Sequence, residues 1–259
     1  MGGAELSVKL LVYIFVFWFG AVWGSFLNVC IYRLPRGLSP LEGRSFCPFC
    51  GTQIRSYDSI PLLSFLILRG RCRSCRAPIS RRYPLVEALA GFLAVFFFWL
   101  FPPERALLNF LFASCLLVIS FIDFEHQIIP SWMCAGGMLG GVLVSLFGLG
   151  VPLKESIFGI FTGIGVLFTV RWLYELLRKE EGLGEGDLEL MAFVGAFLGV
   201  KGALFAVWVG FALGGILGLI LTAVKKAERK SALPFGPFLA LGAFIYAAAG
   251  ESILSFWRL

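Results

Sequence analysis

The chain has 259 residues, of which 59% are hydrophobic, 16% aromatic and only 15% charged, and its mean hydropathy is +0.88. A soluble domain would be roughly half apolar and about a quarter charged, so this composition excludes an ordinary soluble protein and indicates a membrane protein with several spans. The net charge of +6 does not indicate a nucleic-acid partner, because the basic residues lie between apolar runs, where they act as topology signals.

Eight apolar runs are candidates for helices that cross the bilayer, since about 20 helical residues span roughly 30 Å of hydrocarbon. The first run is too long for the core of a signal peptide and lacks a small-residue cleavage site, so we expect it to be retained. The sixth run is the shortest. The predicted fold is therefore an all-α polytopic membrane protein with about eight transmembrane helices, at 10–31, 85–101, 107–122, 131–149, 156–177, 188–200, 202–224 and 235–256.

The positions of Lys and Arg predict the orientation of these helices. Residues 32–84 hold ten arginines, and two further connections on the same side hold Arg178, Lys179 and the four basic residues of 225–230. The opposite side receives only single basic residues: Lys9, Arg105, Lys154, Lys201 and Arg258. The positive-inside rule then places 32–84 in the cytosol and both termini outside. We expect a first helix (1–31), a cytosolic domain (32–84) and a seven-helix membrane domain (85–259).

The cytosolic segment contains two C-x-x-C pairs, Cys47 and Cys50 in CPFCG and Cys72 and Cys75 in CRSC, with 21 residues between them. This spacing is typical of a four-cysteine zinc ribbon, in which each pair supplies two thiolates to one tetrahedral zinc. A segment this small has little core of its own, so a structural zinc would stabilise its fold. Two disulfides are the alternative, which a cytosolic location opposes. The other cysteines lie in apolar runs and are expected in the core: Cys30, Cys115 and Cys134.

Aspartate is rare here, since the chain contains only Asp58, Asp123 and Asp187. Asp123 lies at the end of the third run and Asp187 at the start of the sixth, so both are assigned to the cytosolic end of a helix. An ionisable residue beside a membrane helix is a candidate for function. Two carboxyl groups that meet can share one proton, so that one activates water while the other donates a proton to the substrate. The alternative is that each Asp only marks a helix boundary, with Asp187 as an N-cap.

Other polar residues near the two aspartates are weaker candidates. Three glycines, Gly182, Gly184 and Gly186, would let the backbone approach a substrate strand closely. His126 is the only histidine and is expected to be interfacial. Glu125 and Glu189 are interpreted as solvated charges at helix ends.

Seven stretches in order along the chain resemble the type IV prepilin peptidases, the bifunctional leader peptidase/N-methyltransferases of the GxGD aspartyl class. They are GSFLNVCIYRLP (24–35), CPFCG, CRSC, RRYPLVEALAG (81–91), SFIDFEHQIIP (120–130), GEGDLELMAFVGAFLG (184–199) and LPFGPFLALG (233–242). The resemblance implies that Asp123 and Asp187 are the catalytic aspartates of an intramembrane aspartic endopeptidase.

The resemblance also implies the substrates and cofactors. Prepilin and pseudopilin precursors, each with a short basic leader before an apolar helix, would be cut on the cytosolic side of the bacterial inner membrane, typically between Gly and Phe. The new amino terminus would then be methylated with S-adenosylmethionine as the methyl donor; no residue is assigned to that donor.

The chain departs from the family pattern at two positions. Ser131 follows the Ile-Pro where the family often has Asp, and Glu189 stands where a Lys is common. Two other functions stay open on the residues alone: an ion- or proton-coupled transporter that uses the two aspartates, and a membrane scaffold that docks a partner through the cysteine domain.

Overall fold

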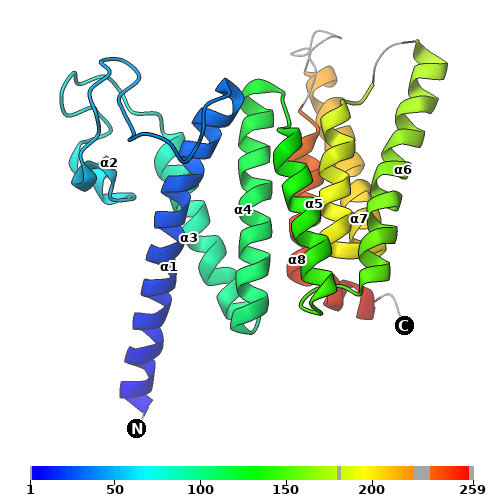
Figure 1. The fold of residues 1–259 in the computed structure, drawn as a ribbon, viewed down its shortest axis with the longest axis horizontal. Coiled ribbons are helices and arrows are strands. Elements are labelled where there is room, and N and C mark those ends of the chain that lie inside the picture. Colours follow the sequence, from blue (N-terminus) through cyan, green and yellow to red (C-terminus); the bar gives the residue numbers. More distant parts are fainter. Residues whose placement is uncertain (1, 180–181, 225–233, 257–259) are drawn as a thin grey trace. The chain divides into compact units, whose positions relative to one another are not determined.

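A computed structural model describes residues 2–179, 182–224 and 234–256, which are helical apart from their connections (Figure 1). The helices are α1 (Gly2–Arg33), α2 (Leu63–Ile67), α3 (Arg82–Leu100), α4 (Pro103–His126), α5 (Ser131–Leu146), α6 (Leu153–Arg178), α7 (Glu185–Ala223) and α8 (Gly236–Phe256), with 3-10 turns η1 (Leu34–Arg36) and η2 (Ser56–Ser59). Among the described residues, five helices are long and apolar enough to cross a membrane, and α5 and α8 are shorter apolar helices. The predicted all-α, multi-pass architecture is confirmed. The basic residues of 225–230 and Arg258 lie outside the described residues.

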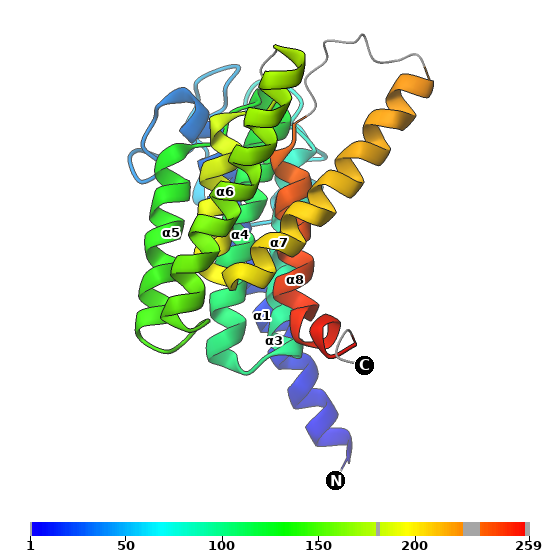
Figure 2. The ribbon, with the colours of Figure 1, turned by 90° about the vertical axis from the view of Figure 1, so that its right-hand side faces the viewer.

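Helix α7 covers both the sixth and the seventh predicted runs. Its 39 residues would extend about 58 Å as a straight helix, far more than the roughly 30 Å of a bilayer core. The helix is interrupted at Gly199, whose φ of 74° and ψ of −172° are not helical. Glycine adopts this backbone conformation readily, whereas residues with a side chain rarely do. Figure 2 shows the result, two arms that meet at a bend near the middle of α7. The arms, 185–198 and 200–223, correspond to two of the predicted runs.

The chain divides into two compact units, Met1–Ser114 and Cys115–Leu259. In the first unit, α1 packs on α3 through small residues. A Cβ at Gly20 would lie 2.6 Å from the carbonyl oxygen of Ala90, and one at Gly24 would lie 2.8 Å from Cα of Glu87, so the two helices approach as closely as only glycine permits. The buried side chain of Asn28 adds a hydrogen bond from Nδ2 to the carbonyl of Tyr83 (3.0 Å).

The second unit is built around α7, which packs against α5, α6 and α8. The first arm of α7 contacts α5 and α6, and the second arm contacts α8. Leu190, Met191 and Val194 of the first arm are fully buried. Gly159 of α6 and Gly195 of α7 face each other so closely that a Cβ on either would collide with backbone of the other. Ser156 Oγ also donates to the carbonyl of Ala196 across the same interface (2.7 Å). These contacts hold the first arm of α7, which carries Asp187 in its first turn, against α6.

Within this unit, α4 and α6 end at the same end of the bundle, and α5, α7 and α8 begin there (Figure 1). The α5–α6 connection and the bend at Gly199 lie at the other end. Because α4 ends and α7 begins at the same end, the two aspartates on these helices are brought to one level of the second unit.

Candidate active site and metal centre

Asp123 lies in the last turn of α4 and is only 6% exposed. Its Oδ2 accepts a hydrogen bond from the backbone N–H of Gly236 (3.0 Å), the first residue of α8. The first N–H groups of a helix have no acceptor inside that helix and carry its positive end. The amino end of α8 is therefore directed at the carboxylate of Asp123.

Asp187 lies in the first turn of α7 and is 7% exposed. Its Oδ2 accepts the N–H of Gly184 at 3.3 Å. The alternative interpretation, that Asp187 is the N-cap of its helix, is wrong. Helix α7 begins at Glu185, so Gly184 is the N-cap and Asp187 is the third residue of the helix. From that position a side chain reaches back to the N–H of the capping residue, as the third residue of a capping box does.

Ile129, in the connection between α4 and α5, links the surroundings of the two aspartates. A Cβ at Gly186 would lie 2.7 Å from Ile129 Cβ, and one at Gly236 would lie 3.2 Å from Ile129 Cδ1. Ile129 thus packs against the glycine before Asp187 and against the glycine that binds Asp123. The two carboxyl groups are also close enough to interact electrostatically. The structure therefore brings together the two residues that the sequence placed 64 positions apart.

The three glycines before Asp187 have separate local roles. A Cβ at Gly182 would collide with the ring of Tyr174, Gly184 donates its N–H to Asp187, and Gly186 receives Ile129. The close approaches at Gly182 and Gly186 are made by side chains of this protein. These glycines therefore shape the start of α7 itself.

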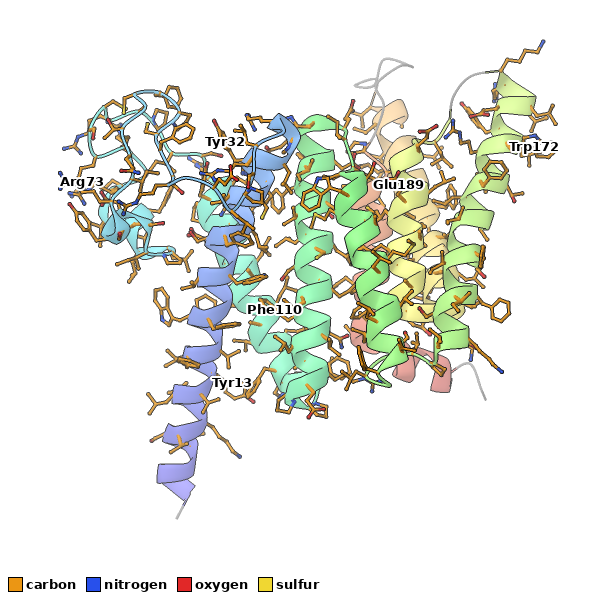
Figure 3. The ribbon with its side chains drawn as sticks, in the orientation of Figure 1. Tyr13, Tyr32, Arg73, Phe110, Trp172 and Glu189 are labelled. Atoms are coloured by element: carbon orange, nitrogen blue, oxygen red, sulfur yellow. The ribbon has the colours of Figure 1, made fainter. Side chains whose placement is uncertain are left out.

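The prediction that Glu189 is a solvated charge is wrong. Its side chain is half-buried, and Oε2 is buried without a hydrogen-bond partner among the described residues. Glu189 lies near the end of α7 at which the helix begins (Figure 3). The carboxylate of Glu189 interacts electrostatically with the buried thiol of Cys134 on α5. His126 ends α4, with Nε2 4.0 Å from Oε2 of Glu125 and without a hydrogen-bond partner in the described part of the chain.

The four cysteines of the two C-x-x-C pairs converge in the first unit. Their Sγ atoms all lie within 4.8 Å of one another, and those of Cys47 and Cys75 are 3.8 Å apart. Four thiolates about 2.3 Å from one tetrahedral zinc would be about 3.8 Å apart. All seven cysteines are free, so the alternative of two disulfides is not what the structure contains. The donor set and its spacing fit a metal ion. Cys30 and Cys134 are buried in the core, as predicted, and Cys115 is partly buried.

The two cysteine turns, residues 47–51 and 72–76, have the same backbone conformation. In the first, the N–H of Gly51 donates to the carbonyl of Cys47 (2.9 Å) and Gly51 has a φ of 69°. In the second, the N–H of Arg76 donates to the carbonyl of Cys72 (3.0 Å) with a φ of 60°. Each turn thus ends in a left-handed residue that directs both thiols to one point. A hydrogen bond with Thr52 lowers the pKa of Cys50 to about 6, whereas desolvation and the neighbouring thiols raise the pKa of Cys75 to about 11. The four groups therefore do not all become thiolates easily without a cation between them.

Two sets of polar contacts hold the loops of this small segment together. Arg73, inside the second cysteine turn, bonds both oxygens of Asp58 (2.9 and 2.6 Å) and holds the pKa of that carboxyl below its usual range (Figure 3). Arg33, which the sequence suggested only as a topology signal, is buried at the end of α1. Its guanidinium donates to carbonyls of the following loop, including those of Ser39 (3.1 Å) and Gly43 (3.2 Å).

Gly236 is the functional residue that sequence reasoning missed. It belongs to the LPFGPF stretch, in which a glycine followed by a proline indicates the start of a helix. Nothing local in that stretch indicates that its N–H meets Asp123, because the two are 113 residues apart in sequence.

Comparisons with known proteins identify the family of the chain. Residues 18–101 match the bacterial peptidase A24 N-terminal domain, and residues 110–219 match the type IV leader peptidase family. A prepilin leader peptidase/N-methyltransferase of Stutzerimonas stutzeri is 35% identical over 258 residues, covering 90% of this chain and 89% of the relative. Relatives with the same name in Aeromonas hydrophila (35% over 263 residues; 92% and 91%) and Burkholderia pseudomallei (36% over 249; 86% and 81%) are similar. No solved structure matches. The chain is therefore a multi-pass membrane protein that belongs to the bacterial type IV leader peptidase family, together with the prepilin leader peptidase/N-methyltransferases.

Proposed function

We propose that Asp123 and Asp187 are the catalytic pair with which this prepilin leader peptidase/N-methyltransferase cleaves its substrates. The observation that carries the proposal is the meeting of two buried carboxyl groups at one end of the second unit, each held by the N–H of a glycine. Burying two acids with no cationic partner among the described residues is costly, so their retention at one place supports a role in chemistry.

The arrangement suits acid–base hydrolysis of a peptide bond. Both hydrogen bonds use Oδ2, which leaves the other oxygen of each carboxyl group for water or substrate. We infer that the two carboxyl groups share a proton, because like charges side by side cannot both form easily. The ionised partner takes a proton from the attacking water, and the protonated partner donates one to the carbonyl oxygen or to the leaving amine. In forming the tetrahedral intermediate, the two carboxyl groups exchange roles and keep one proton between them. When the C–N bond breaks, the protonated group gives its proton to the amine and the other takes one from a hydroxyl of the intermediate, so the starting state of the pair is restored.

The substrates we propose are prepilin and pseudopilin precursors, cut at the cytosolic end of their apolar helix to release a short basic leader. Prepilins are the proteins on which the named relatives act. We propose that the same enzyme then methylates the new amino terminus with S-adenosylmethionine. The groove of about 320 Å³ lined by Phe19, Val22, Trp23 and Phe26 is apolar and does not fit the polar groups of that donor, so we assign it no part in methylation.

We further propose eight membrane crossings in the bacterial inner membrane, with the aspartates at the cytosolic surface. The length of α7, its bend at Gly199 and the short apolar helices α5 and α8 support this number. The arginines of 32–84 support a cytosolic position for that segment. We infer three functional parts: the first helix (1–31), the metal domain (32–84) and the peptidase domain (85–259).

We propose that the metal of residues 32–84 is a structural zinc. Cys47, Cys50, Cys72 and Cys75 would hold it, and the ion would supply the folding energy that this small segment lacks. No step of the hydrolysis requires it.

The test is cleavage of a purified prepilin precursor in detergent by Asp123→Asn and Asp187→Asn variants, read by mass spectrometry. Both variants are expected to lose cleavage while keeping the fold. Asp58→Asn is the matched control, because Asp58 is the third aspartate of the chain and pairs with Arg73 at the protein surface. Full activity in either site variant would remove that residue from the chemistry. Ion uptake by reconstituted vesicles, with no cleavage, would favour the transporter instead.

A further inference from the structure

The short helix α2 in the cytosolic segment exposes a run of large apolar side chains. Leu63, Leu66 and Ile67 are 43%, 69% and 73% exposed, and Ile60 just before the helix is 42% exposed. Spacings of three and four residues place them on one face. On the other face, Phe65 packs over Gly70, whose Cβ position would be 3.0 Å from the ring. The helix therefore has an inner face held by the segment and an apolar outer face.

The start of α2 is held at the level where α3 enters the membrane. The backbone N–H of Leu62 donates to Oε2 of Glu87 on α3 at 2.8 Å, and Glu87 is itself buried. Glu87 is five residues beyond Arg82, the first residue of α3, which is about 7 Å along the helix axis. Each headgroup layer of a bilayer is about 5–7 Å thick. Figure 1 shows α2 beside the upper turns of α3.

Cationic side chains border this apolar face. Arg69 and Arg71 follow α2 directly, are exposed, and have no carboxylate partner among the described residues. Arg73 differs, because it is bound to Asp58. An apolar helix face bordered by free arginines is the arrangement by which helices lie in the surface of an anionic membrane, with the side chains inserted and the guanidinium groups at the phosphates.

We propose that α2 is an interfacial helix that inserts Leu63, Leu66 and Ile67 into the cytosolic surface of the bilayer, where Arg69 and Arg71 bind anionic phospholipid headgroups. Insertion would fix the metal domain against the membrane at a third point, besides its covalent links to α1 and α3. The domain would then keep a constant height at the membrane surface.

The full-length protein tests this in proteoliposomes of phosphatidylcholine and phosphatidylglycerol with brominated acyl chains, which quench fluorophores that enter the bilayer. An environment-sensitive fluorescent amino acid replaces Ile67. The matched control replaces Phe49, which is 70% exposed in the first cysteine turn of the same segment. We expect the fluorophore at position 67 to lose most of its emission and the one at position 49 to keep it.

The charge requirement is tested in the same preparation with Arg69→Gln and Arg71→Gln together, which should reduce the quenching at position 67. Omitting phosphatidylglycerol should have the same effect. Equal quenching at positions 67 and 49, or none at 67, would overturn the insertion. Quenching that ignores both the arginines and the anionic lipid would overturn the headgroup site. A photo-crosslink from position 67 to protein, without quenching, would replace the lipid by a protein partner. Cleavage activity is not measured, so these outcomes are independent of the proposed catalytic pair.

Discussion

Replacing Gly236 by alanine should move the carboxylate of Asp123 without unfolding the protein. The added Cβ would lie 2.7 Å from Asp123 Oδ2, whereas ordinary contacts begin at 3.4 Å. Gly236 is the first residue of α8 and has no left-handed backbone to strain. The atom that has to give way is the end of a side chain, so the carboxylate retreats by about 0.7 Å while the helices stay packed.

The expected loss follows from the hydrogen bond between the Gly236 N–H and Asp123 (3.0 Å), which the retreat weakens or breaks. A hydrogen bond to a charged group contributes about 1.5–3 kcal/mol. If the transition state depends on that geometry, kcat/KM falls by about 10- to 150-fold, since 1.36 kcal/mol is a factor of ten. A misplacement of about 1 Å at a reacting group has a cost of similar size, about 100-fold.

The assay is prepilin cleavage at several substrate concentrations with Gly236→Ala, with thermal unfolding in detergent to show that the fold is kept. Gly215→Ala in the second arm of α7 is the control, because a Cβ there would meet nothing within 4 Å. Unchanged kcat/KM in a folded Gly236→Ala enzyme would refute the role of this bond in positioning Asp123. A loss of equal size in Gly215→Ala would show that the effect is not local.

The remaining predictions concern packing and the metal. Gly159→Ala should lower the free energy of unfolding by about 1–3 kcal/mol, because its Cβ would lie 2.7 Å from the backbone of Gly199. Gly165→Ala is the control and should change the stability little, because a Cβ there would meet nothing within 4 Å. Equal thermal stability of the two variants would argue against the close α6–α7 contact. Cys72→Ser should lose the near-stoichiometric zinc of the purified protein, and wild-type protein that is folded but metal-free would exclude the site. Gly51→Ala should weaken zinc binding by about 1 kcal/mol, because Gly51 has a φ of 69° that alanine adopts only with strain. Arg76→Gly should not weaken it, because glycine accepts the left-handed backbone at that position. Competition with a chelator measures both affinities, and a stronger site in Gly51→Ala would contradict the turn geometry.

Much of the fold and of the candidate site could be predicted from the sequence, because the signals are local. Apolar runs of the length of a bilayer core predict helices, and the C-x-x-C spacing predicts that each turn presents two thiols to one ligand. The ordered motifs along the chain indicate the family without any tertiary information. Asp123 and Asp187 stood out because an acid at the end of an apolar helix is costly and therefore rare.

Only the tertiary structure decided which distant groups meet. Helix packing brings the amino end of α8 to Asp123, places Ile129 between Gly186 and Gly236, and buries Oε2 of Glu189 without a partner. It also folds α7 into two arms at Gly199 and sets α2 beside Glu87. None of these contacts can be predicted from the local sequence, because the residues of one helix do not specify which other helices will pack against it. Those neighbours are selected by the close fit of small residues across helix interfaces, which exists only once the whole chain has packed.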